Sequence, residues 1–329
     1  MARSAPKVGA MTTEFRAPEQ VQRFIFEGRP VRGHWVGIGQ GWRDLRQFRD
    51  YSPPVQELLG QAVCAALLLA ATLKFKGTLT LQLQGTGAVG LLVAQCTHDF
   101  RYRALARAQG EGAATSLTPE VFRWLVGEEG RLTVTIEAEE RDMRYQGVVP
   151  LQGHSLAVCL EQYFASSEQL PTRVRLAADP DQAAGLLVQR VPEVGGSAAD
   201  SADDEAGTAW ADAQASLEAV TAADLLQFTG EELLMQDFRQ HDVRVFAGTP
   251  VRFECRCDTD RVGTMLRGLG EAEVRDVLKE QGAVTVTCDF CNRPYEYDAA
   301  AVDALFATAG GQQAHAEGDP GHGSGHSLH

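Results

Sequence analysis

Alternating apolar and polar residues mark the first half of the chain as sheet-forming. From Thr78 to Gln84 every second residue is a leucine and the residues between are Thr or Gln. Period two predicts a strand with one buried face. Gly85-Thr86-Gly87 predicts a turn. We predict further strands at Ala88 to Thr97, Phe100 to Ala106, Leu132 to Ala138, Tyr145 to Val149 and Arg173 to Ala177, and helices at Pro119 to Val126 and Leu156 to Ser166.

The most apolar segment predicts a buried helix from Leu58 to Leu73. Its most apolar run, Ala62 to Ala71, is too short to cross a bilayer. Because the connections between the strands are short, neighbouring strands are expected to be mostly antiparallel. The fold class is therefore α+β, with an N-terminal core domain at residues 20–190.

An acidic segment follows this domain. Between Arg190 and Arg239 there is no lysine or arginine, and there are eleven acidic residues. Its first half, Val194 to Ser216, is rich in Ala, Gly, Ser and Asp and predicts a flexible linker or surface insertion. Residues 191–240 are therefore expected to form a partly helical acidic linker.

The second half of this linker has an apolar stripe on an acidic background. Thr229-Gly230-Glu231-Glu232 predicts a capping box at the start of a short helix that ends at Phe238. Such a stripe could dock reversibly on another domain. Its members are Leu225, Leu226, Phe228, Leu233, Leu234 and Phe238.

Four of the seven cysteines form two close pairs, Cys255-x-Cys257 and Cys288-x-x-Cys291, with thirty residues between the pairs. Zinc prefers tetrahedral thiolate coordination, and two such pairs can supply all four ligands. With strands expected at Val243 to Phe246, Val251 to Cys255 and Val284 to Thr287 and a helix at Glu271 to Glu280, residues 241–307 predict a ββ-α-β zinc module. A module of this size has a thin core, so zinc would supply much of its folding free energy, on the order of 10 kcal/mol.

The spacing leaves three roles for this zinc site. It could be a static structural or nucleic-acid-binding zinc ribbon, a thiol oxidoreductase using Cys288 and Cys291, or a redox sensor. The net charge of −14 disfavours binding to nucleic acid. Near the cysteines, acidic residues lie among the arginines, so no purely basic face is expected there. A disulfide between residues i and i+2 closes a small strained ring that is readily reduced, which favours a sensor at Cys255 and Cys257.

No enzyme motif is apparent. Gly85 to Gly90 fits G-x-G-x-x-G, but the strand-like LLVAQCT that follows predicts a hairpin turn. Cys64, Cys96 and Cys159 are expected to be buried core thiols. The chain start shows no secretory signal, so we expect a reducing, cytoplasmic location and no membrane partner. The His-rich tail, residues 308–329, is expected to be disordered.

Three stretches, together with the cysteines, resemble a known family. They are LLGQAVCAALLLAATLKFKGTLTLQLQGTG (Leu58 to Gly87), YFASSEQLPTRVRLA (Tyr163 to Ala177) and HDVRVFAGTPVRFECRC (His241 to Cys257) continuing at CDFCNRPYEYD (Cys288 to Asp298). Together they resemble the redox-regulated thirty-three-kilodalton heat-shock chaperone family over roughly Phe24 to Phe306.

The resemblance implies an ATP-independent holdase that binds unfolding client proteins. In the reduced form, zinc bound by residues matching Cys255, Cys257, Cys288 and Cys291 would keep it inactive and monomeric. Oxidation would form the disulfides Cys255–Cys257 and Cys288–Cys291, release zinc, unfold the linker and favour a homodimer. The Ala- and Asp-rich insertion within the linker departs from the family pattern and puts the folding-back of the linker in question.

Overall fold

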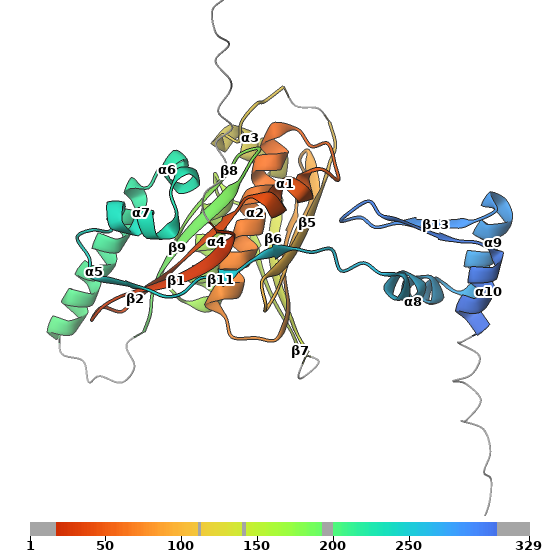
Figure 1. Ribbon diagram of the computed structural model, residues 1–329. Coiled ribbons are helices and arrows are strands. Elements are labelled where there is room, and N and C mark those ends of the chain that lie inside the picture. Colours follow the sequence, from red (N-terminus) through yellow and green to blue (C-terminus); the bar gives the residue numbers. More distant parts are fainter. Residues whose placement is uncertain (1–17, 111–112, 140–142, 193–199, 308–329) are drawn as a thin grey trace, which may run out of the picture. The chain divides into compact units, whose positions relative to one another are not determined.

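The computed structural model describes residues 18–110, 113–139, 143–192 and 200–307 (Figure 1). The chain forms two compact units, which divide between Cys255 and Arg256. The first contains two large sheets and most of the helices, so the α+β fold class is confirmed.

The first sheet has the strand order β10-β1-β2-β9-β8, and β11 also pairs with β1. Every pairing in this sheet is antiparallel. Both faces of its central strands are covered, so β2 and β9 are buried almost throughout. The strands are β1 (Gln20–Phe26), β2 (Val31–Ile38), β8 (Thr172–Ala178), β9 (Ala183–Arg190), β10 (Val243–Val245) and β11 (Thr249–Pro250).

The second sheet has the order β12-β5-β4-β3-β6-β7. It is antiparallel except for β12, which pairs with β5 in parallel. The leucines of β3 are buried and its Thr and Gln residues are more exposed, as the alternation predicted. The strands are β3 (Gly77–Gln84), β4 (Val89–Thr97), β5 (Arg101–Ala108), β6 (Arg131–Ala138), β7 (Met143–Pro150) and β12 (Arg252–Phe253).

Helix α2 (Pro53–Thr72) packs between the two sheets and forms the centre of the main core. Its length and composition would suit a membrane span, but 78% of its most apolar window is buried inside the protein. Gly60 lets α2 approach the first sheet closely, because a Cβ there would lie 2.6 Å from the Ala178 side chain. The predicted buried helix is therefore confirmed. The other helices here are α1 (Gln40–Arg46), α3 (Pro119–Val126), α4 (Leu156–Tyr163) and the π-helix η1 (Phe164–Glu168).

Three helices from the acidic segment cover the opposite face of the first sheet: α5 (Asp200–Ala219), α6 (Ala222–Gln227) and α7 (Gly230–Asp237) (Figure 1). The predicted capping box of Thr229 and Glu232 is present, and Thr221 and Asp224 form a second one. The apolar stripe is docked. Its residues pack with Phe24, Phe26 and Trp35 in a second core.

For this stretch the sequence predicted a flexible linker or a surface insertion within a partly helical linker, and its described part is a helix. Residues from Asp200 onward form the regular helix α5, and Ala213 and Leu217 are completely buried against the first sheet. The apolar residues of α5 are few but recur at helical spacing, so a narrow stripe is enough to dock an Ala-rich helix. Residues 193–199 lie outside the described part of the chain.

A strap of short strands carries the chain from α7 to the first cysteine. β10 and β11 pair with the edge of the first sheet, and β12 pairs with the edge of the second. Val251 is buried in the main core, and the Phe253 ring packs 6.0 Å from that of Tyr102. Glu254 then forms an ion pair of 3.0 Å with Arg101.

The second unit is a small helical module around one hairpin. Its elements are α8 (Thr259–Leu269), α9 (Glu271–Gln281), β13 (Val284–Thr287), β14 (Pro294–Tyr297) and α10 (Ala299–Ala307). β13 and β14 pair in an antiparallel register from Val284 opposite Tyr297 to Thr287 opposite Pro294. The ββ-α-β prediction was therefore wrong: the strands at 243–253 belong to the sheets of the first unit.

Candidate metal centre

Two turns present the four cysteines. Cys255 and Cys257 lie between β12 and α8, and the Asp258 carboxylate caps α8 by accepting from the Arg261 amide at 2.8 Å. Cys288 and Cys291 lie in the turn between β13 and β14. There the Cys288 amide donates to the Arg293 carbonyl and the Asn292 amide donates to the Cys288 carbonyl, each at 2.9 Å. Asn292 closes the turn with a positive φ of 52°, which Asn tolerates better than most residues.

The four sulfur atoms converge. All of them lie within 4.8 Å of one another, and the Sγ atoms of Cys257 and Cys291 are 3.3 Å apart. Four sulfurs at about 2.3 Å from a central zinc would be about 3.8 Å from each other, because these are the edges of a tetrahedron. A disulfide would instead place two sulfurs about 2.0 Å apart. The cluster therefore consists of free thiols in an arrangement that fits a tetrahedral metal ion such as zinc.

The site is half-buried. Each of the four cysteines is intermediate in exposure, so the cluster is neither part of a buried core nor fully exposed. Among the described residues, this is the group of cysteine, histidine and acidic side chains whose ligand atoms come close enough to hold a metal ion. The scattered histidines form no such group there, and the tail histidines lie outside the described residues.

Tyr295 was not singled out from the sequence, and Arg293 was considered only as one of the arginines of a possible nucleic-acid face. The pKa of Tyr295 is raised to about 12, chiefly by its interaction with Cys257 and secondly by burial. The pKa of Arg293 is raised, first by Tyr295 and then by the charges of Cys257 and Cys291. The positive charge of the Arg293 guanidinium favours the thiolate forms of Cys257 and Cys291. The positions of Arg293 and Tyr295 in the sequence, two and four residues after Cys291, could have indicated that they lie near the sulfurs.

The unit around the site has a small core of six buried side chains. The Tyr297 hydroxyl ties the hairpin to α8 by donating to the Thr259 carbonyl at 3.0 Å. Few apolar groups are therefore available to hold the two cysteine turns together, and a bound metal would add a cross-link at this point. The buried side chains are Val262, Leu266, Val274, Val284, Tyr297 and Val302.

The other predictions about reactive groups are confirmed. Cys64, Cys96 and Cys159 are buried in the main core, and burial raises the pKa of the Cys64 and Cys159 thiols. The Gly85 to Gly90 motif is a hairpin turn between β3 and β4, with the Gly85 amide donating to the Gly90 carbonyl at 3.2 Å. No helix begins there, so the motif is not a dinucleotide-binding loop.

Comparison with known proteins identifies relatives along nearly the whole chain. A family model described as Hsp33 protein matches residues 19–298. The 33 kDa chaperonin of Nitrosococcus oceani is 40% identical over 288 residues, which is 88% of this chain and 94% of that protein. The 33 kDa chaperonin of Methylobacillus flagellatus is 38% identical over 291 residues, 88% of this chain and 95% of that protein.

A solved structure shares the fold. The crystal structure of the 33 kDa chaperonin from Thermotoga maritima matches with a TM-score of 0.73 and covers 89% of this chain and 100% of its own. Because the two sequences are only 21% identical, this match shows a shared fold and nothing further.

Proposed function

The chain belongs to the Hsp33 family, and from that premise we propose that it is a redox-switched, ATP-independent holdase chaperone. Its relatives are named as chaperonins, which places this chain among chaperones and not among enzymes. The observation that carries the proposal is the arrangement along the chain. A cluster of four thiols directly follows a strap, and the strap directly follows helices docked on an apolar face.

In the reduced state, Cys255, Cys257, Cys288 and Cys291 are the proposed ligands of zinc. Zinc, when bound, keeps the four sulfurs as thiolates and cross-links a unit whose own core is small. The outer face of the first sheet is covered by α5, α6 and α7, so its apolar side chains are withheld from other proteins. This state is the inactive one, and we propose that it is monomeric.

The proposed switch is the oxidation of two thiolate pairs, Cys255 with Cys257 and Cys288 with Cys291. For each pair, one hydrogen peroxide and two protons are consumed, one S–S bond forms, the O–O bond breaks and two waters leave. The sulfurs lose two electrons and peroxide gains them. Formation of both disulfides leaves no thiolate ligand for the metal, so the metal is released.

Loss of the ligand set acts on the docked helices through the strap. The second unit has a small core, so it unfolds when it loses its main cross-link. Strand β12, which leads into Cys255, has only two residues and therefore resists detachment weakly. The helices α5, α6 and α7 are then released. Release exposes Phe24, Phe26, Val31 and Trp35, a contiguous apolar surface of the kind that binds unfolding proteins. The same surface would support a homodimer of the oxidised form.

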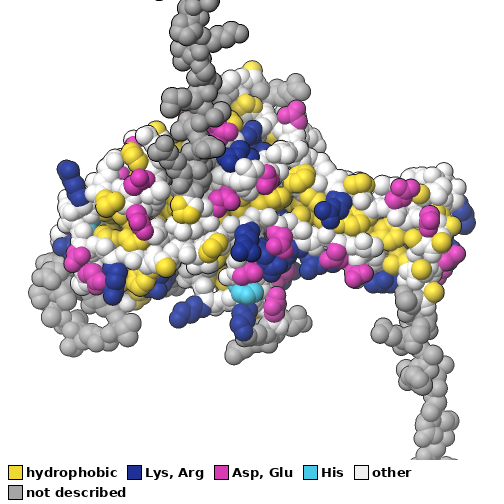
Figure 2. Space-filling view, viewed as in Figure 1, with side chains coloured by type: hydrophobic (Ala, Val, Ile, Leu, Met, Phe, Trp, Pro, Cys, Tyr) yellow, Lys and Arg dark blue, Asp and Glu magenta, His cyan; other side chains and the backbone are white. Residues whose placement is uncertain are grey.

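Two rival functions predict different behaviour. A nucleic-acid-binding zinc ribbon needs a basic face, whereas Lys and Arg are interspersed with Asp and Glu on the face drawn in Figure 2. Near the cysteines, Arg261 is paired with Asp258 at 3.6 Å. A thiol oxidoreductase would turn over a dithiol substrate through Cys288 and Cys291. The proposed location is the cytoplasm, whose reducing conditions keep resting thiols reduced.

The test compares reduced, zinc-loaded protein with peroxide-treated protein as suppressors of client aggregation. Light scattering by a thermally unfolding client should fall only with the oxidised protein, and adding ATP should change nothing. Equal suppression by both forms would refute the switch. Multiple turnovers of a dithiol substrate, or tight binding of DNA or RNA at physiological salt, would favour one of the rivals.

A further inference from the structure

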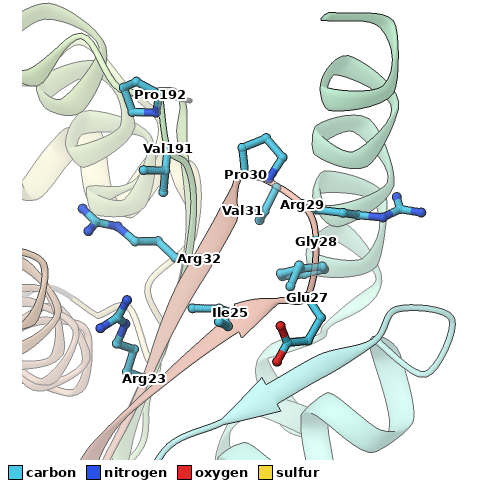
Figure 3. Close-up of a pocket in the computed structure, with 11 residues that line it drawn as sticks. Arg23, Ile25, Glu27, Gly28, Arg29, Pro30, Val31, Arg32, Val191 and Pro192 are labelled. Carbon is cyan, nitrogen blue, oxygen red and sulfur yellow. The ribbon is translucent and has the colours of Figure 1, made fainter. Parts of the chain in front are cut away.

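The hairpin of β1 and β2 presents two arginines on one face of the first sheet. Arg23 on β1 lies opposite His34 on β2, and Ile25 lies opposite Arg32. Side chains alternate between the faces of a sheet. These four therefore point away from the face that α5, α6 and α7 cover. Figure 3 shows both arginines extending to the same side, with their guanidinium groups turned toward each other.

A pocket of about 480 Å³ lies at this place. Its walls are mostly aliphatic, and Ile25, Pro30, Val191 and Pro192 contribute to them (Figure 3). The pocket is open to solvent and Arg23 is exposed, so the attraction between its arginines and a bound anion is expected to weaken as salt is added. The pocket is large enough for a small phosphate compound.

One of the two arginines is held in position by buried groups. The Arg32 guanidinium donates two hydrogen bonds to Gln189 Oε1, at 3.0 and 2.6 Å. Gln189 in turn donates to the Thr172 hydroxyl at 3.0 Å, and both of these residues are at least 98% buried. Arg23 lies over the Phe246 ring at 5.2 Å. Both guanidinium groups keep donors available for a ligand.

The positive charge of the pocket is not neutralised within the described residues. Neither Arg23 nor Arg32 forms an ion pair there. The acid that lines the pocket, Glu27, is paired with Arg244 at 2.8 Å. The third arginine of the pocket, Arg29, is directed to Asp212 of α5, 3.7 Å away (Figure 3). Two uncompensated cations on one concave surface are unusual in a chain whose net charge is −14.

His34 lies on the same face of the sheet as the two arginines, opposite Arg23. It is 3% exposed, and its Nδ1 has no hydrogen-bond partner in the described structure. Burial first, and then the charges of Arg32 and Arg23, lower the pKa of His34 to about 4. The imidazole is therefore neutral at neutral pH and adds no charge to this face of the sheet.

We propose that the pocket between Arg23 and Arg32 binds the phosphate group of a small anionic molecule. A phosphate dianion matches two guanidinium charges and offers enough acceptor oxygens for both forks. The site is separate from the cysteine cluster and does not rest on the proposed redox function.

Binding of inorganic pyrophosphate to the full-length protein, followed by titration calorimetry at low ionic strength, tests this site. We expect saturable binding with a Kd below about 1 mM that weakens as salt is added. R23Q and R32K should each weaken binding by about tenfold or more, because R32K keeps the charge but loses the guanidinium fork. R123Q, on α3 away from the pocket, removes an exposed arginine that is paired with Glu120 and should bind within about twofold of the parent.

Two outcomes would overturn the proposal. They are the absence of saturable binding up to about 10 mM pyrophosphate and an equal loss of binding in R123Q and R23Q. Circular dichroism of each variant separates loss of binding from loss of folding. R23Q leaves the hydrogen bonds between Arg32 and Gln189 in place.

Discussion

Phe238, at the end of α7, packs edge-on against Phe26 of β1, with the ring centroids 6.0 Å apart and the planes inclined at 70°. Both rings are almost completely buried, and Phe24 completes the aromatic cluster. The contact fastens the last of the three acidic-segment helices to the sheet. It lies directly before the strap that leads to Cys255. In our account this contact is released when the switch operates.

Replacing Phe238 by Ala should loosen the docked helices without oxidation. Removing a buried phenyl ring costs about 3–5 kcal/mol, much of the free energy that holds so small a docked segment. Hydrogen exchange should speed up in α6 and α7, and the reduced protein should gain part of the aggregation-suppressing activity.

Met235→Ala on the same helix is the matched control, because Met235 is 69% exposed and its truncation leaves no cavity. If F238A and M235A exchange alike and both stay inactive when reduced, the aromatic contact does not restrain the helices.

Replacing Cys291 by Ser should abolish tight metal binding. The hydroxyl of serine is a poor zinc ligand at neutral pH, and Cys291 lies within 4.8 Å of the other three sulfurs. Purified C291S should hold far less than one equivalent of zinc and lose it quickly to a chelator. C159A, which removes a buried thiol of the main core, should retain a full equivalent.

Disulfide mapping of the peroxide-treated parent by mass spectrometry tests the proposed pairing. We expect Cys255–Cys257 and Cys288–Cys291. The 3.3 Å approach of the Cys257 and Cys291 sulfurs makes a bridge between the two turns the natural competitor. A dominant Cys257–Cys291 bridge would refute the proposed pairing and leave two ligands free.

His34 should make the first unit sensitive to mild acid. Its pKa is about 4 in the folded protein and about 6.5 when unfolded, so the unfolded state binds the proton more readily. The stabilisation that the folded protein gains from keeping His34 neutral is fully present above about pH 6.5. It is lost as the pH falls toward 4. Between pH 7.5 and 5.5 the free energy of unfolding should fall by about 1 kcal/mol through this residue.

Urea unfolding of the parent and of His34→Gln at these two pH values measures this loss. The variant should lose less stability on acidification than the parent. His154→Gln, at an exposed position, is the control and should follow the parent. If H34Q and the parent lose stability equally, burial of neutral His34 does not explain the acid sensitivity.

The sequence predicted the elements whose pattern is local. The leucine alternation of β3 and the helix α3 at Pro119 to Val126 were observed as predicted. β2 and β9 were missed because α2 covers one face of their sheet and the acidic-segment helices cover the other, so they show no alternation. The stretch at 243–253 was recognised as strands but assigned to the wrong unit, since the pairing of short strands with distant edges has no local signature.

The candidate site was predictable for a similar reason. The spacing of two close cysteine pairs was enough to predict a four-thiolate metal site. The four sulfurs do converge in the structure, as that prediction requires. Arg293 and Tyr295 interact electrostatically with the sulfurs, but in the sequence they look like ordinary hairpin residues. Their role is recognisable only once the structure places them near the cysteines. The docking of α5 required knowledge of the apolar face that receives it.

The most direct test of the central claim follows four quantities in one sample of reduced, zinc-loaded protein exposed to peroxide under mild heat. They are zinc release, the loss of the four thiols, hydrogen exchange in α5 to α7, and suppression of client aggregation. The account predicts that all four change together and that reduction with added zinc reverses them. Loss of zinc and of all four thiols with no change in client aggregation would contradict it.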